Sequence, residues 1–147
     1  MKKKNAIIFS FALFIVFLDH LTKWLIRKNL HLNHSVPLIN NFLSLTYITN
    51  NGSAFGLFKG FNLFFIFFSI VVIGLILYFI RKIKENERLL QFLAGLLLGG
   101  TLGNLFDRLV YGSVIDFIDF RIWPVFNVAD SAVTISVILL VLVLWKK

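Results

Sequence analysis

Aspartates are the residues of this sequence best suited to catalysis. Five of the seven acidic residues are aspartates, and these are Asp19, Asp107, Asp116, Asp119 and Asp130. Asp19, Asp107 and Asp130 lie inside or at the edge of stretches that are otherwise apolar enough to cross a membrane. Because a charged side chain in lipid costs several kcal/mol, such residues are usually kept for a function. We therefore expect these aspartates to contribute to a functional site at one side of a membrane.

A close pair of carboxylates can hydrolyse a peptide bond without any other reactive group. Two neighbouring carboxylates do not both ionise readily, so the pair keeps one proton near neutral pH. The ionised member can take a proton from water while the protonated member polarises the scissile carbonyl. From the residues alone, this pair could be drawn from Asp107, Asp116, Asp119 and Asp130.

Other catalytic chemistries find little support in the composition. The sequence contains no cysteine, which excludes disulfides, thiolate nucleophiles and zinc–thiolate sites. Its three histidines, His20, His31 and His34, are not arranged as a metal-binding cluster. We therefore expect an enzyme that uses neither a metal nor a cofactor.

The apolar composition predicts an all-α polytopic membrane protein with four transmembrane helices. The chain has 147 residues, of which 59% are hydrophobic, and its mean hydropathy is +0.87. A helix needs about 20 apolar residues to cross a bilayer. Four stretches meet this requirement, at about 6–27, 61–80, 89–110 and 126–145. They leave no room for a water-soluble domain, so we expect residues 1–147 to form a single membrane domain.

The basic residues predict how the spans are oriented. Nine of the 15 lysines and arginines lie at 2–4, 81–88 and 146–147, on one side of the four spans. The basic side of a membrane protein is usually cytoplasmic, so we expect both termini in the cytoplasm. The net charge of +8 then reflects topology and contact with anionic phospholipid, rather than binding of nucleic acid.

Two outer loops, at 28–60 and 111–125, should lie on the opposite side of the membrane. Phe42–Thr49 is rich in β-branched and aromatic residues and predicts a strand. Asn50–Gly52 is typical of a turn, and Ser53–Phe58 is expected to return as a second strand. We therefore expect a small extracytoplasmic β-sheet. The mixture of apolar and charged residues in 111–125 suits the lipid–water interface.

Polar residues on three spans fall at the same depth. Asp19, Asn104 and Asp130 each lie 15 or 16 residues from the basic residue at the cytoplasmic end of their span. At 1.5 Å per residue, they lie roughly 22–24 Å from the inner surface. The hydrocarbon core is about 30 Å thick. This agreement predicts a shared site near the edge of the outer leaflet.

Each of these spans also carries three polar residues on one helix face. Their spacing of i, i+3 and i+4 makes them neighbours on the helix surface. The three sets are Asp19, Thr22 and Lys23; Asn104, Asp107 and Arg108; and Asn127, Asp130 and Ser131. They could serve as structural cross-links between helices or as a site. We expect Asp19 to pair with Lys23, because pairing lowers the cost of burying both charges.

Glycines punctuate the third span. Gly95, Gly99 and Gly103 recur every four residues, with Gly100 beside them. This spacing predicts close packing against neighbouring helices. The small residues could also leave space for a ligand beside Asn104.

Five segments carry the polar residues described above. They are Asp19–Lys23, Asn50–Gly56, Gly99–Arg108, Tyr111–Phe117 and Phe126–Ser131. Together they resemble segments of the bacterial lipoprotein signal peptidases, the signal peptidase II family, in the same order and over most of the chain. The stretch between Asp116 and Asp130 is shorter than in other members, which could alter substrate tolerance.

The resemblance implies a specific reaction and a specific pair of aspartates. The catalytic residues of the signal peptidase II family correspond to Asp116 and Asp130 of this sequence. Such enzymes have four transmembrane helices and a small outer β-cradle. They cleave diacylglyceryl-modified prolipoproteins just before the lipidated cysteine, in the bacterial cytoplasmic membrane. We expect prolipoprotein and membrane phospholipid as partners and a monomeric enzyme. The family's supporting positions correspond to Asp19, Lys23, Asn50, Gly100, Asn104, Arg108 and Asn127.

Two other functions are compatible with intramembrane charges. The Asp, Lys and Arg cluster could carry protons or ions in a small transporter. A transport route should continue toward the cytoplasm, yet the residues below Asn104 and Asp130 are mainly Gly, Leu and Val. A non-catalytic lipid-binding or scaffold protein is the other alternative.

Overall fold

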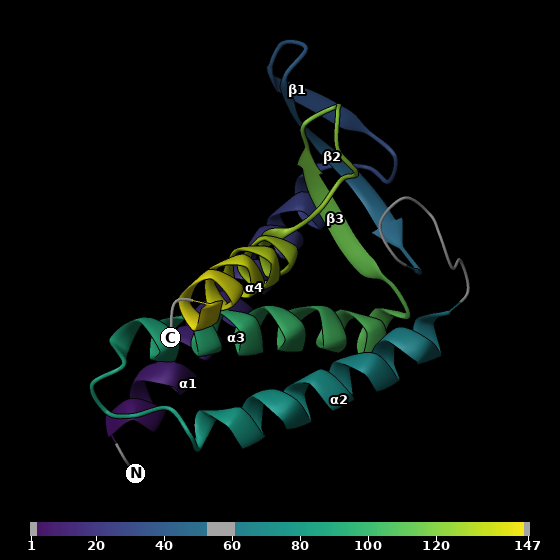
Figure 1. Ribbon diagram of the computed structural model, residues 1–147. Helices are drawn as coiled ribbons and strands as arrows, with labels where there is room; N and C mark the ends of the chain where they lie inside the picture. The colour runs from purple at the N-terminus through teal and green to yellow at the C-terminus, as the bar shows by residue number, and fades with distance from the viewer. Residues whose placement is uncertain (1–2, 53–60, 146–147) are drawn as a thin grey trace.

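The computed structural model describes residues 3–52 and 61–145 and contains four long helices and three strands (Figure 1). In chain order they are α1 (Lys3–Asn29), β1 (Ser35–Ile39), β2 (Leu43–Asn50), α2 (Asn62–Ile80), α3 (Arg88–Tyr111), β3 (Val114–Asp119) and α4 (Val128–Trp145). All four helices are long and apolar enough to cross a membrane. The four predicted spans are therefore confirmed, and their ends shift by three residues at most.

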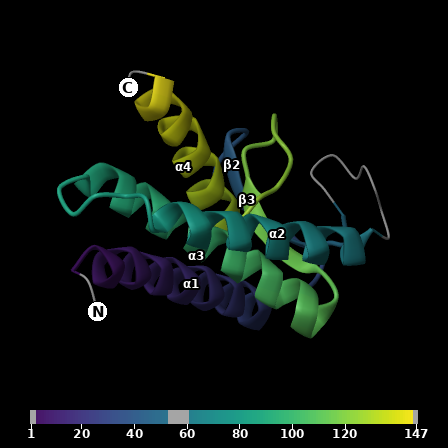
Figure 2. The ribbon, with the colours of Figure 1, turned by 60° about the horizontal axis from the view of Figure 1, so that its bottom comes forward.

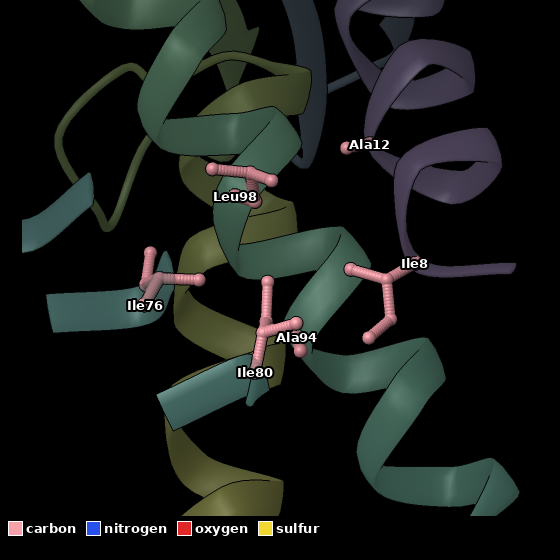
Figure 3. Close-up of a cluster of buried hydrophobic side chains, with 6 residues drawn as sticks. All are labelled: Ile8, Ala12, Ile76, Ile80, Ala94 and Leu98. Carbon is pink, nitrogen blue, oxygen red and sulfur yellow. The ribbon is translucent and has the colours of Figure 1, made fainter. Parts of the chain in front are cut away.

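Helix α3 is the centre of the bundle (Figure 2). It contacts α1, α2 and α4, and it is mostly buried, whereas the other three helices leave most of their apolar surface exposed. One apolar cluster joins α1, α2 and α3, and Figure 3 shows its members Ile8, Ala12, Ile76, Ile80, Ala94 and Leu98. The exposed apolar surface of the outer helices is what a bilayer would cover.

The glycines of α3 permit this central position. A Cβ atom at Gly99 would lie 2.6 Å from the carbonyl oxygen of Ala12 in α1. A Cβ atom at Gly100 would lie 2.5 Å from the carbonyl oxygen of Ala129 in α4. The predicted close packing is therefore confirmed. The suggestion that these glycines leave room for a ligand is wrong at Gly100, because the backbone of α4 fills that space.

A three-stranded antiparallel sheet in the order β1-β2-β3 lies at one end of the bundle (Figure 1). Strand β2 confirms the strand predicted at 42–49. Strands β1 and β3 were not predicted, and β3 replaces part of the irregular loop expected at 111–125. The return strand expected at Ser53–Phe58 lies outside the described residues. Ile26 of α1 packs with Ile115 and Phe117 of β3, so the sheet is anchored on the end of α1.

The end of the bundle away from the sheet gathers the start of α1, the α2–α3 connection and the end of α4 (Figures 1 and 2). Lys4 is buried there. Its Nζ donates hydrogen bonds to the carbonyl oxygens of Ile80 and Arg81, both at 3.2 Å, and also to that of Ile83. Ile80 is the last residue of α2 and the other two follow it, so Lys4 supplies donors to carbonyl groups at and just beyond the C-terminal end of this helix.

We predict that Gly99→Ala destabilises the protein, because the new Cβ would contact the backbone of α1. The expected loss is about 1–3 kcal/mol in the free energy of unfolding, as for other overpacked sites. Thermal unfolding of detergent-solubilised protein measures it.

Gly74→Ala in α2 is the matched control, since a Cβ there would meet nothing within 4 Å. This variant should be neutral or slightly stabilised, because alanine favours helix more than glycine. Equal unfolding temperatures for the two variants would contradict the packing described for Gly99.

Candidate active site

The start of α4 fixes the position of Asp130. Asn127 precedes the helix, and its Oδ1 accepts a hydrogen bond of 2.8 Å from the backbone N–H of Asp130. In return, the N–H of Asn127 donates to Oδ2 of Asp130 at 3.3 Å. This reciprocal arrangement is a capping box. The other carboxylate oxygen, Oδ1, accepts a bond of 2.7 Å from Nδ2 of Asn104 in α3.

Strand β3 carries the second carboxylate, Asp116. Asp116 lies opposite Ile48 of β2 in the sheet, and it is only 1% exposed. Oδ1 accepts a hydrogen bond of 2.7 Å from Nδ2 of Asn127, and Oδ2 accepts one of 3.1 Å from Nδ2 of Asn50. Asn127 therefore bonds to both Asp116 and Asp130 and holds the two carboxylates beside each other.

Both carboxylates line one pocket of about 630 Å³. Its wall is formed by residues from β2, α2, α3, the β3–α4 connection and α4; besides the two aspartates they include Asn50, Gly52, Phe65, Arg108, Trp123, Phe126, Ser131 and Thr134. Asp130 is half-buried and lines this pocket, so its side chain borders the space in which a substrate could bind. A pair of acids facing a mostly apolar pocket is able to activate water next to a bound peptide.

Burial and the neighbouring charge change the protonation of the pair. Burial and, as a second cause, the charge of Asp130 together raise the pKa of Asp116 to about 7, against the opposing hydrogen bonds from Asn50 and Asn127. At neutral pH the pair therefore holds a proton for much of the time, as acid–base catalysis by two carboxylates requires.

A buried lysine joins the helices behind the pair. Nζ of Lys23 lies 2.7 Å from Oδ2 of Asp19, 2.8 Å from Oδ2 of Asp107 and 3.1 Å from Oδ1 of Asn104. All three N–H groups of the ammonium thus have acceptors. The expected pairing of Asp19 with Lys23 is confirmed. Oδ1 of Asp19 also accepts a bond of 3.0 Å from the N–H of Ala129, where the positive end of the α4 dipole favours a carboxylate.

The structure separates the four aspartates that the sequence left as alternatives. Asp107 belongs to the Lys23 cluster and does not line the pocket. Asp119 bonds to Thr46 Oγ1 at 2.7 Å and lies 3.7 Å from Nε of Arg121, on the outer part of the sheet. Because side chains alternate along a strand, Asp116 and Asp119 point to opposite faces of β3. The sequence analysis treated this segment as loop, so it could not use this distinction.

The remaining positions of the expected site fall into two groups. Arg108 and Asn50 line the pocket, whereas Gly100 packs against α4 and does not. Phe65 of α2 was missed by the sequence analysis, although it lines the pocket and lies under the Arg108 guanidinium. It is one of 18 phenylalanines in the chain, and no feature of the sequence distinguishes it. Among residues 3–52 and 61–145, no three His, Cys, Asp or Glu side chains are grouped as a metal site.

Comparison with known proteins identifies the family. A family model described as signal peptidase (SPase) II matches residues 11–146. The chain belongs to the signal peptidase II family. It is therefore a multi-pass membrane peptidase, and the sequence resemblance is confirmed.

Similar curated proteins agree with membership of the signal peptidase II family. A lipoprotein signal peptidase of Halothermothrix orenii is 40% identical over 140 residues, which cover 95% of this chain and 96% of the relative. A lipoprotein signal peptidase of Moorella thermoacetica is 45% identical over 129 residues, covering 88% of this chain and 86% of the relative.

Solved structures show the same fold. A bacterial membrane enzyme determined by the in meso method at 2.3 Å has a TM-score of 0.87 and 38% identity, covering 93% of this chain and 86% of the other. A second, at 1.9 Å, has a TM-score of 0.85 and 37% identity, covering 94% and 92%.

We predict that Lys23→Met strongly destabilises this signal peptidase II, because it leaves Asp19 and Asp107 buried without their cation. Removal of one member of a buried ion pair typically costs about 3–5 kcal/mol. Lys28→Met is the control on the same helix, since Lys28 is exposed and its Nζ lies 5.0 Å from the centre of the Trp24 ring. Thermal unfolding in detergent compares the two, and similar losses would argue against a central role for Lys23.

Proposed function

We propose that this protein removes the signal peptide from diacylglyceryl-modified prolipoproteins by cleaving before the lipidated cysteine, with Asp116 and Asp130 as the catalytic pair. The observation that carries this proposal is the bridging of the two carboxylates by Asn127 at one pocket. Membership of the signal peptidase II family supports the substrate class. Residues 1–147 would act as a single membrane peptidase domain.

The pair would hydrolyse the peptide bond by acid–base catalysis. The ionised carboxylate takes a proton from a water molecule, whose oxygen attacks the scissile carbonyl carbon. The protonated carboxyl donates a hydrogen bond to the carbonyl oxygen, which gains negative charge in the tetrahedral intermediate. Collapse of the intermediate breaks the C–N bond as a proton passes to the leaving amine. No covalent enzyme intermediate forms.

The supporting residues hold this pair and its substrate. Asn127 and Asn104 orient the carboxylates through the hydrogen bonds of 2.7 Å that they donate. Nε of Arg108 is buried and has no hydrogen-bond partner among the residues that the structure describes, and we propose that the guanidinium binds a substrate carbonyl. Asn50 begins a turn closed by the N–H of Gly52, which donates to Asn50 Oδ1 at 2.9 Å, and this turn would contact the substrate from outside.

Three further residues would support the site without contacting the substrate, namely Asp19, Lys23 and Gly100. The Asp19–Lys23 pair fixes α1 against α3 and α4, and Gly100 allows α4 to approach α3 closely. We also propose that the outer loop around Asn50–Phe55 clamps the substrate; residues 53–55 of this loop lie outside the described part of the chain.

An apolar pocket provides a place for the signal peptide. A second pocket, of about 620 Å³, lies between α2, α3 and α4 at the end away from the sheet; its walls are mostly apolar and include Val72, Leu75, Leu97, Leu140 and Leu144, with Lys82, Lys84 and Glu87 of the α2–α3 connection as its charged residues. We propose that the apolar signal helix extends from the catalytic pair along this side of α3. The apolar wall is the opposite of what a proton or ion pathway requires, and it therefore favours the peptidase over the transporter.

The same arrangement supports a placement in the membrane. We propose a monomer in the bacterial cytoplasmic membrane, with both termini cytoplasmic and the catalytic pair near the outer leaflet. The basic α1 start and α2–α3 connection lie at the end opposite the sheet. Ile122 and Trp123 are exposed on the sheet side, where aromatic residues favour the lipid–water interface. Phospholipid would cover the apolar outer faces of α1, α2 and α4.

We predict that Asp116→Asn and Asp130→Asn each reduce cleavage of a lipidated precursor at least about 100-fold, because each removes an acid–base group. The measurement is the rate of signal-peptide release by purified variants in detergent. Asp119→Asn is the matched control, since Asp119 lies on the same strand but bonds to Thr46 and Arg121. Unchanged cleavage by either of the first two variants would reject the pair.

We also predict that kcat/KM, which depends on the pKa values of the free enzyme, falls as the pH rises above about 7. The pKa of Asp116 is raised to about 7, so below this pH the pair holds its proton and above it both carboxylates ionise. The decrease should approach about tenfold per pH unit, the slope for loss of one essential proton. A pH–rate profile measures it, with Asp119→Asn expected to give the same profile. A rate that stays level between pH 7 and 9 would contradict the shared proton.

A further inference from the structure

We infer that Phe65 is a positioning residue for cleavage, which holds the guanidinium of Arg108 at the catalytic pocket through a cation–π contact. This inference rests on the proposed function, in which Arg108 binds a carbonyl of the substrate. It assigns a role to α2, the helix whose described residues include no ionisable group apart from Tyr78.

The first observation is the geometry of the contact. The guanidinium carbon of Arg108 lies 5.2 Å from the centroid of the Phe65 ring, within the distance of about 6 Å at which a cation is attracted by the ring face. Both side chains line the pocket of the two aspartates, and both are half-buried. The contact therefore lies at the wall of the site, where partial exclusion of water strengthens it.

The second observation is how little else holds the guanidinium. Its only hydrogen bond among the described residues is one of 3.4 Å from Nη1 to the carbonyl oxygen of Asn104, one turn earlier in the same helix, and the charges of nearby aspartates attract it only from beyond ion-pair distance. Within residues 3–52 and 61–145, no carboxylate lies within ion-pair distance of Arg108, and its Nε is buried without a partner. Lys23 differs in this respect, because all its donors have acceptors. An arginine side chain has many rotamers, and fixing one of them costs entropy. The Phe65 ring would lower this cost by limiting the rotamers that Arg108 can adopt.

The third observation is that two contacts join α2 to Arg108 of α3, of which the Phe65 ring makes one. Nδ2 of Asn62 donates a hydrogen bond of 3.4 Å to the carbonyl oxygen of Arg108. Asn62 and Phe65 are spaced i and i+3, and therefore lie on one face of α2. The backbone and the side chain of Arg108 are thus both held from the same face, and the position of the guanidinium depends on that of α2.

The test compares variants of Phe65 in the cleavage assay with a lipidated precursor. Phe65→Leu removes the ring face and should lower kcat/KM roughly 2- to 30-fold, the range that corresponds to cation–π contacts of different exposure. Phe65→Tyr keeps the ring face and should retain the wild-type value within about twofold. Phe67→Leu, on the exposed side of α2, is the matched control and should cleave as the wild type does. If thermal unfolding shows that Phe65→Leu is misfolded, Phe65→Met replaces it.

A double-mutant cycle separates a positioning role from direct contact with substrate. If Phe65 acts through Arg108, Phe65→Leu has no further effect once Arg108→Ala is present. An undiminished effect in that background would overturn the inference, as would full activity of Phe65→Leu alone. Asp116→Asn in the same assay keeps the two proposals apart, because its full activity would reject the catalytic pair whatever Phe65 does.

Discussion

The buried ammonium of Lys23 constrains how the three helices around the site come together. A cation inside a membrane span requires acceptors on every N–H group, and these come from Asp19, Asp107 and Asn104. Asp19 in turn accepts the N–H of Ala129 at the start of α4. One charge therefore fixes the register of α1 against α3 and, through Asp19, the start of α4. A shift of any of these helices by one turn would leave a buried charge without a partner.

The proposed catalytic pair, Asp116 and Asp130, depends on this register through amide side chains. Asn104 accepts a bond from Lys23 and donates one to Asp130, while Asn127 bonds to Asp116 and to the backbone of Asp130. An amide has a donor end and an acceptor end, so the lysine at one end determines which end of Asn104 faces the carboxylate. The amide dipole of Asn104 thereby links the buried Lys23 ion pairs to the carboxylate of Asp130.

Much of this arrangement could be predicted from the sequence, because it depends on spacing along helices. The common level of Asp19, Asn104 and Asp130 along their helices and their clustering on helix faces follow from regular helical geometry. Strand β3 could not be recognised in the same way, because it is buried on both faces and shows no alternation of apolar and polar residues. As a result, the residues alone gave no reason to prefer Asp116 over Asp119, and only the family resemblance did. Phe65 was equally hidden, because its role depends on which face of α2 meets Arg108.

The contacts of Lys4 have a consequence for the order of assembly. Its acceptors lie 76 to 79 residues later in the chain, so they are not yet synthesised when α1 first enters the membrane. Until α2 has been inserted and the chain has turned back, the first turn of α1 has no protein partner for its ammonium, and lipid headgroups and water solvate it instead. During that interval these hydrogen bonds do not yet fix the position of α1 relative to α2. Once the α2–α3 connection is in place, the same lysine holds the start of α1 against the end of α2, at the end of the bundle away from the sheet.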